Sequence, residues 1–187
     1  IQPMSIPSTE VPRPMLVIEG KAEMRAWTRA RRADGLTVGF VPTMGFLHEG
    51  HLSLVRQASA RCDRVVVSIY VNPTQFAPNE DFDVYPRDSE GDLQKLQSLG
   101  VDAVFMPTDL YDGGQDRGAC RTWVEVSQLT TTLCGASRPH FFRGVTTVVT
   151  KLFNIVEPDI AVFGQKDYQQ WRVIDKMVKG LDIPVEI

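Results

Sequence analysis

Cysteine is scarce in this sequence, and its scarcity argues against two kinds of structural site. The chain of 187 residues contains three cysteines, Cys62, Cys120 and Cys134, which are far apart and include no Cys-x-x-Cys pair. An odd and scattered set of this kind supplies neither a disulfide framework nor a zinc knuckle. We therefore expect the protein to work in a reducing compartment, the cytoplasm.

Long apolar runs and a strong excess of charge are also lacking. No apolar run approaches the roughly 18 residues that indicate a membrane-spanning helix, and the N-terminus has no pattern of a signal peptide. The formal net charge of -3 gives no general attraction to DNA, RNA or anionic membranes. We expect neither nucleic acid nor a membrane as a partner, and a small phosphorylated ligand fits this charge better.

The two ends of the sequence differ from the part between them. Residues 1–14 contain four prolines and no hydrophobic period, which predicts a flexible leader outside the fold. Residues 183–187 have the composition of a strand that is cut off, so we expect the sequence to be part of a longer chain. The hydrophobic content of 43% is enough for one principal domain, which we place at residues 15–187.

Short apolar runs alternate with longer amphipathic stretches along this domain. That alternation is typical of parallel strands joined by crossover helices, so we predict an α/β fold. Residues 64–71 are nearly continuous in Val and Ile, as in a strand covered on both faces. Strands are predicted at residues 37–41, 64–71, 101–106, 122–126 and 160–163, and helices at residues 47–61, 89–99, 144–156 and 168–179.

Residues 41–51 carry the strongest local signal, because a predicted strand passes through a Pro/Gly turn into a helix that begins with two histidines. His48 and His51 share one face of that helix. Beside the free N–H groups and the positive end of the helix dipole, they form a cluster of donors for phosphate oxygens. Such donors stabilise negative charge in a phosphoryl or adenylyl transfer. A zinc site is disfavoured, because His-Glu-x-x-His would place the second histidine one residue later.

The motif His48-Glu49-Gly50-His51 resembles the His-x-Gly-His signature of the nucleotidylyltransferase superfamily. With Pro42-Thr43-Met44-Gly45 before it, the segment resembles the pantothenate synthetase family in particular. This resemblance covers residues 15–187 and implies a Rossmann-like parallel sheet with helices on both faces, and a homodimer. Three later segments carry the same resemblance: Val71-Asn72-Pro73-Thr74-Gln75-Phe76, Tyr85-Pro86-Arg87 followed by Asp92, and Phe163-Gly164-Gln165-Lys166-Asp167-Tyr168-Gln169-Gln170.

The resemblance implies a two-step ligase reaction that uses ATP. The carboxylate of D-pantoate attacks ATP to give pantoyl adenylate and pyrophosphate, and the amine of beta-alanine then displaces AMP to give pantothenate for coenzyme A biosynthesis. A carboxylate is its own nucleophile, so the protein needs only to position the reactants and stabilise charge. Full family members continue into a C-terminal lid domain that this chain lacks, which implies a truncated form with little or no turnover.

The resemblance also implies roles for individual residues. His48, His51 and Lys166 are the catalytic candidates, and Asp92 matches a position associated with Mg2+ and ATP. Family members often have His at the position of Phe141, so the adjacent His140 receives no role. Contacts with ATP are implied for Met44, His48, His51, Gly164, Lys166 and Asp167, and contacts with pantoate for Asn72, Gln75 and Gln170.

Other interpretations of the same residues stay open at this point. Asn72 followed by Pro73 is common at the start of a turn, and Asp92 alone resembles a solvated charge on a helix. Another small-molecule adenylyltransferase would use a phosphate acceptor, which calls for Arg or Lys where Gln75 and Gln170 stand. A non-catalytic, dimerising binding domain is the alternative from a different class.

Overall fold

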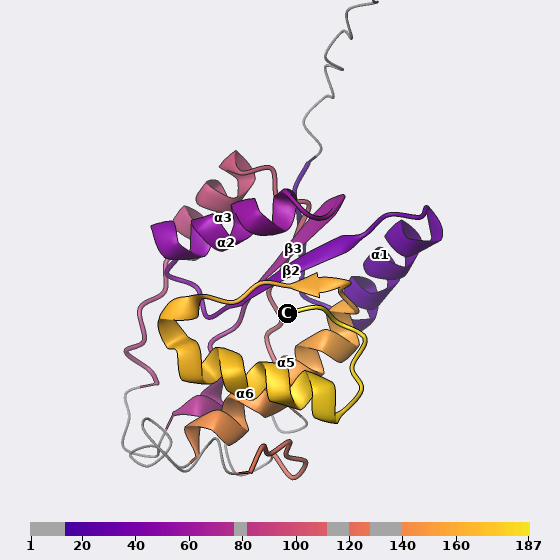
Figure 1. The fold of residues 1–187 in the computed structure, drawn as a ribbon. Helices are drawn as coiled ribbons and strands as arrows, with labels where there is room; N and C mark the ends of the chain where they lie inside the picture. Colours follow the sequence, from indigo (N-terminus) through magenta and orange to yellow (C-terminus); the bar gives the residue numbers. More distant parts are fainter. Residues whose placement is uncertain (1–13, 77–81, 112–119, 128–139) are drawn as a thin grey trace, which may run out of the picture.

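The computed structural model describes residues 14–76, 82–111, 120–127 and 140–187. The predicted leader therefore lies almost entirely outside the described residues. The described part contains a five-stranded sheet in which neighbouring strands are parallel, in the order β1-β4-β3-β2-β5 (Figure 1). The strands are β1 (Leu16–Ile18), β2 (Val38–Thr43), β3 (Arg64–Ile69), β4 (Ala103–Phe105) and β5 (Ile160–Ala161).

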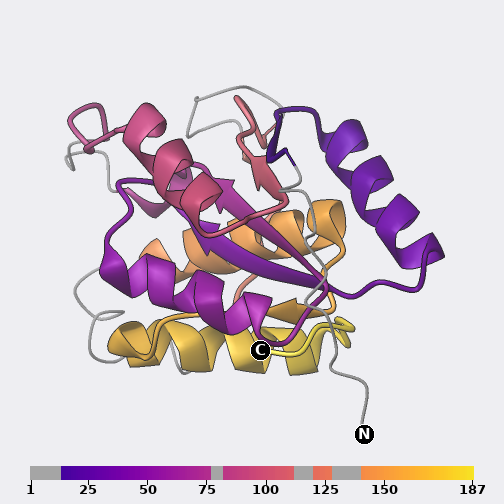
Figure 2. The same cartoon turned by 90° about the horizontal axis from the view of Figure 1, so that it is seen from above.

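Helices cover both faces of this sheet, which confirms the predicted α/β architecture. Figures 1 and 2 show α2 (Glu49–Ser59) and α3 (Ser89–Ser98) together on one face. On the other face lie α1 (Lys21–Ala33), α5 (Phe141–Val156) and α6 (Tyr168–Gly180). Two short 3-10 helices, η1 (Pro73–Gln75) and η2 (Gln165–Asp167), follow β3 and β5. Within the described ranges, no helix has the length and apolarity that crossing a membrane requires.

The order in which the chain forms the strands creates a crevice at the carboxyl ends of the sheet. From β2 the chain passes through α2 to β3 and through α3 to β4, always in the same direction across the sheet. It then returns through α5 to β5, which pairs with the other side of β2. In open parallel sheets, ligands bind at the carboxyl ends of the strands where the direction of winding changes. The fold thus places the candidate site beyond the ends of β2 and β5.

A close contact between α5 and η1 shapes the far wall of this crevice. Most residues of α5 are buried, including Phe142 and Val145. A Cβ atom at Gly144 would lie 2.4 Å from the carbonyl oxygen of Thr74. Only glycine permits the two backbones to approach this closely.

Three details of the sequence prediction need correction. The segment 122–126 is not a strand, because its backbone forms hydrogen bonds with side chains of α5 instead of a neighbouring strand. Val124 N–H donates to Thr147 Oγ1 at 3.0 Å, and Thr146 Oγ1 donates to the Val124 carbonyl at 2.5 Å. The elements β1 and α1 were not predicted. Residues 183–187 form a single bridge, between Ile160 and Glu186, rather than a regular strand.

Candidate active site

A cleft of about 910 Å³ opens at the carboxyl ends of β2 and β5. Its walls come from the end of β2, the first turn of α2, η1, α5, and the segment from η2 into α6. Apolar side chains of α5 form much of one wall, and polar groups project from the other elements. The cleft brings together eight of the residues singled out in the sequence: Met44, His48, His51, Asn72, Gln75, Lys166, Asp167 and Gln170.

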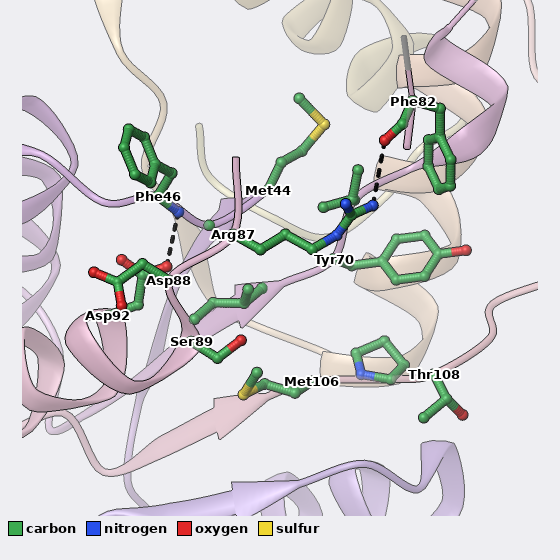
Figure 3. A pocket seen from close by; sticks show the side chains of 14 residues that line it. Met44, Phe46, Tyr70, Phe82, Arg87, Asp88, Ser89, Asp92, Met106 and Thr108 are labelled. Carbon is green, nitrogen blue, oxygen red and sulfur yellow. Dashed lines mark hydrogen bonds between the residues drawn. The ribbon is translucent and has the colours of Figure 1, made fainter. Parts of the chain in front are cut away.

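Two of the predicted site residues lie outside the lining of this cleft. Gly164 is the residue before η2, so it sets the direction in which Lys166 and Asp167 leave the sheet. Asp92 lines a smaller neighbouring cavity of about 290 Å³, which shares Met44 and Tyr70 with the main cleft (Figure 3).

The two histidines cap the helix that carries them. His48 is the N-cap of α2, and its Nδ1 accepts the N–H of Gly50 at 3.1 Å. The Nδ1 of His51 accepts the N–H of His48 at 3.3 Å, and the ring centroids are 4.1 Å apart. A neutral imidazole whose Nδ1 accepts must carry its proton on Nε2. Both rings therefore have a donor N–H at the end that is remote from the backbone.

The charge state of His51 follows from its surroundings. Burial first, and then the nearby His48, lower the pKa of His51 from its ordinary value of 6.5. Asp92 and Asp167 raise the pKa, but by less. His51 is thus neutral at physiological pH and offers a hydrogen-bond donor rather than a full charge.

A buried carboxylate holds the turn that precedes these histidines (Figure 3). Asp92 is 1% exposed, and its two oxygens accept the N–H groups of Phe46 and Leu47, both at 2.7 Å. The turn needs this support because Gly45 and Phe46 have positive φ angles of 84° and 53°. Lys95 adds a bond from Nζ to the Leu47 carbonyl at 3.0 Å. Asp92 is therefore not a solvated helix charge, and its contacts fix the approach of the chain to His48.

An amide pair at η1, Asn72 and Gln75, also lines the cleft. Asn72 is 1% exposed, and its Nδ2 donates to Gln75 Oε1 at 2.9 Å and to the Gly144 carbonyl at 3.2 Å. Asn72 is thus more than the start of a turn, because it ties η1 to α5. Both residues line the cleft, and Gln75 is the more exposed of the two.

The segment after β5 closes the third side of the cleft. Lys166 and Asp167 are exposed on η2, and Gln170 is half-buried in the first turn of α6. Their exposure at the rim lets a flexible ammonium and a carboxylate move toward a ligand. His140, at the start of α5, does not line the cleft, whereas Phe141 does.

Sequence reasoning missed two groups of residues at this site. The first is a set of aromatic side chains that line the cleft, including Phe76, Tyr85 and Phe163, of which Phe76 and Tyr85 make an edge-to-face contact at 5.8 Å. Their positions inside the recognised motifs were the signal that could have identified them. The second group is the pair Thr74 and Tyr111, whose hydroxyl groups bond to Asn72. No local pattern connects Tyr111 to a residue that lies 39 positions earlier.

Comparison with known proteins assigns the family. The family model described as pantoate-beta-alanine ligase matches residues 16–187. The chain belongs to this family. Two curated relatives are the pantoate–beta-alanine ligase of Oryza sativa subsp. japonica, 57% identical over 198 residues, and the pantothenate synthetase of Pelotomaculum thermopropionicum, 56% identical over 175 residues. The alignments cover 94% and 92% of this chain but only 63% and 60% of the relatives, so the chain spans less than two thirds of their length.

Solved structures agree with this assignment. Pantothenate synthetase from Thermus thermophilus is 46% identical with a TM-score of 0.81, covering 92% of this chain and 60% of that one. Pantoate-beta-alanine ligase from Francisella tularensis, complexed with beta-gamma ATP and beta-alanine, is 39% identical with a TM-score of 0.82. That match covers 93% of this chain and 66% of the other.

Proposed function

We propose that this chain supplies the ATP- and pantoate-binding part of a pantoate–beta-alanine ligase. The reaction is the ATP-dependent condensation of D-pantoate with beta-alanine through pantoyl adenylate, giving pantothenate, AMP and pyrophosphate. One observation carries the proposal: the cleft combines a histidine pair at a helix N-terminus with an amide pair and a lysine. The ATP and beta-alanine named for the Francisella tularensis relative support the same substrates.

The two walls of the cleft suit the two reactants of the first step. A carboxylate oxygen of pantoate attacks the α-phosphorus of ATP, and the bond to pyrophosphate breaks. Negative charge grows on the phosphate oxygens, where the Nε2–H groups of His48 and His51 and the ammonium of Lys166 can stabilise it. In the second step the amine of beta-alanine attacks the carbonyl carbon of the adenylate, and AMP leaves with the former carboxylate oxygen. The protein contributes position and electrostatics to both steps.

The remaining contacts are part of the proposal. Met44, Gly164 and Asp167 would contact ATP together with His48, His51 and Lys166. Gln75 and Gln170 would contact pantoate. Because Asn72 is 1% exposed, we propose that it acts on pantoate mainly through Gln75.

Magnesium enters the proposal as the counter-ion of the ATP phosphates. Mg2+ in nucleotide sites is held by one or two carboxylates together with phosphate oxygens. The Asp92 carboxylate is buried and accepts two backbone N–H groups, so its contacts favour a positioning role, and we derive no step through the metal. Among the described residues, no group of three or more His, Cys, Asp or Glu side chains converges on a metal site. Direct ligation by Asp92 stays a prediction.

A homodimer and a cytoplasmic location complete the proposal. Two of the three cysteines, Cys62 and Cys120, are free in the described structure, in keeping with a reducing compartment. Light scattering on the purified chain would test the dimer.

Isothermal titration with D-pantoate and with ATP and Mg2+ tests the proposed function. We expect Gln75→Ala to weaken pantoate binding by tenfold or more with little change for ATP, and His48→Ala to do the reverse. Gln57→Ala is the matched control, because Gln57 is exposed on α2 and does not line the cleft. Binding of neither ligand to the folded wild-type chain would contradict the proposal. Adenylyl transfer to pantoate, followed by release of pyrophosphate, would exclude a purely structural role.

A further inference from the structure

Arg87 belongs to one of the recognised motifs but has no role in the site described above. It ends the motif Tyr85-Pro86-Arg87, and its side chain lines the smaller cavity rather than the main cleft (Figure 3). The main cleft is lined instead by Tyr85, two positions earlier. Because Arg87 does not line the space where the reactants are proposed to bind, an effect on them must pass through other residues.

The guanidinium of Arg87 binds the backbone of the loop that precedes it. Its Nη1 donates to the carbonyls of Asp83 at 3.1 Å and Tyr85 at 3.2 Å, and its Nη2 donates to the carbonyl of Phe82 at 3.3 Å. The bond to Phe82 is partly buried and is drawn in Figure 3. A guanidinium carries five N–H donors in a fixed planar fork, so one side chain can hold all three carbonyls.

The converging carbonyls of this loop are stabilised by the cation between them. Residues 82–87 form neither a helix nor a strand, so a regular pattern of backbone bonds does not set their shape. Carbonyl oxygens carry partial negative charge, and bringing three of them to one point is unfavourable unless a positive group lies among them. We therefore expect the loop to change shape when the guanidinium is removed.

The loop in turn places aromatic side chains at the cleft. The ring of Phe76 makes edge-to-face contacts with Phe82 at 5.4 Å and with Tyr85 at 5.8 Å between centroids. Arg87 thus binds the backbone of both residues that pack on Phe76. Phe82 is 7% exposed. Tyr85 and Phe76 line the cleft, and Phe76 follows Gln75 directly in the chain.

We propose that Arg87 is a positioning residue that, by holding this loop, places Tyr85 and Phe76 as a wall of the cleft against the acid substrate. This inference rests on the proposed function, because the acid at that wall is D-pantoate. A direct contact of Arg87 with the phosphates of ATP is the competing role, since arginine commonly binds phosphate. The two roles predict losses of affinity for different ligands.

Isothermal titration of Arg87→Met with D-pantoate and with ATP and Mg2+ separates these roles. Methionine keeps an unbranched, flexible stem but removes every donor. We expect pantoate binding to weaken about tenfold, with ATP binding unchanged and a native circular dichroism spectrum. Arg61→Met is the matched control and should change neither affinity, because Arg61 is exposed beyond the other end of α2, pairs with Glu186 and lines neither cavity. Unchanged pantoate binding, or an equal loss for ATP, would overturn the proposal.

A double-variant cycle tests whether Arg87 acts through the loop. Tyr85→Ala removes a side chain that the loop presents to the cleft. In that background, Arg87→Met should weaken pantoate binding by less than a further twofold or so. If the two losses instead multiply in full, Arg87 acts independently of Tyr85 and the proposal fails.

Nitration by tetranitromethane at pH 8, measured by peptide mass spectrometry, follows the loop without a ligand. Burial, and then Asp92, raise the pKa of the Tyr85 phenol. A released loop exposes this phenol and lowers its pKa, so Arg87→Met should speed nitration of Tyr85 several-fold, because the reagent attacks the phenolate. Loss of the positive charge alone would raise the pKa and slow the reaction. Tyr168, 61% exposed, and Tyr111, 3% exposed, are internal references whose rates should not change.

An unchanged or slower rate at Tyr85 would show that Arg87 does not hold the loop, and would overturn the proposal. If the wild-type chain binds no pantoate, the proposed function fails instead. The nitration rates alone then decide whether Arg87 fixes the position of Tyr85.

Discussion

At the scale of single residues, hydrogen bonds to the backbone decide which atoms of the site residues can donate to a ligand. A sequence motif does not contain these bonds. His48 and His51 each use Nδ1 to accept a backbone N–H, which leaves Nε2–H as the donor. The sequence predicted that the histidines share a face and lie at a helix N-terminus. It could not predict their tautomer, because that depends on the capping bonds. Nor could it predict that Asp92 is buried under the turn at Phe46 and Leu47, 46 and 45 residues earlier.

A pH prediction follows for His51. Its pKa is lowered in the folded protein, so the unfolded chain takes up a proton first as the pH falls below about 6.5. The contribution of His51 to stability is therefore constant above that pH and decreases from there down to the lower folded pKa. We expect His51→Gln, whose side chain can still accept the His48 N–H, to lose less stability between pH 7.5 and pH 5.5 than wild type does.

Urea unfolding at a series of pH values measures this difference. His140→Gln is the control, because His140 is exposed and does not line the cleft. Equal pH slopes for wild type and His51→Gln would show that the capping histidine is not the titrating group.

At the scale of elements, the long periodic segments could be predicted and the short or tertiary ones could not. The predicted helix at residues 144–156 and the strand at residues 64–71 correspond to α5 and β3, because their apolar residues follow the period of each element. β1 has three residues, too few to establish a period. The segment 122–126 alternates like a strand, yet Thr146 and Thr147 of α5 take up its backbone groups. Bonds to a helix more than 20 residues away leave no local signal.

The crossing of α5 and η1 gives a prediction about elements. In Gly144→Ala the new Cβ would meet the Thr74 carbonyl at 2.4 Å, so the two elements must separate. Ala is favoured over Gly in a helix by about 1 kcal/mol, but the backbone clash should outweigh that gain and destabilise the protein by about 1–3 kcal/mol. The shift would also stretch the bond from Asn72 to the Gly144 carbonyl and weaken pantoate binding.

Gly180→Ala is the matched control for this prediction, because an added Cβ there meets no atom within 4 Å. Denaturant unfolding and titration with pantoate should show both losses for Gly144→Ala and neither for Gly180→Ala. A stabilised Gly144→Ala variant with normal pantoate affinity would contradict the prediction. It would mean that η1 can move away from α5 without changing the positions of Asn72 and Gln75.

At the scale of the whole molecule, one sheet supports two apolar clusters. The cluster under α1, α5 and α6 includes Phe40 and Val66, and the cluster under α2 and α3 includes Val41 and Val67. Adjacent residues of the same strands thus point into opposite clusters, as the period of a strand requires. Because both clusters pack against the same strands, we expect them to lose their packing together. For β3 the sequence predicted this arrangement, because residues 64–71 are nearly continuous in Val and Ile.

Unfolding should therefore be a single transition whichever cluster is weakened. Leu96 of α3 and Ile174 of α6 are both 0% exposed, on opposite faces of the sheet. We expect Leu96→Ala and Ile174→Ala each to lower the free energy of unfolding by about 2–5 kcal/mol. Leu181→Ala, at a side chain that is 50% exposed, should have little effect.

Circular dichroism and tryptophan fluorescence should give coincident urea curves for all three variants. If Leu96→Ala instead separates the two curves, the α2–α3 face unfolds on its own, and the turn that Asp92 holds against His48 would open before the rest of the cleft.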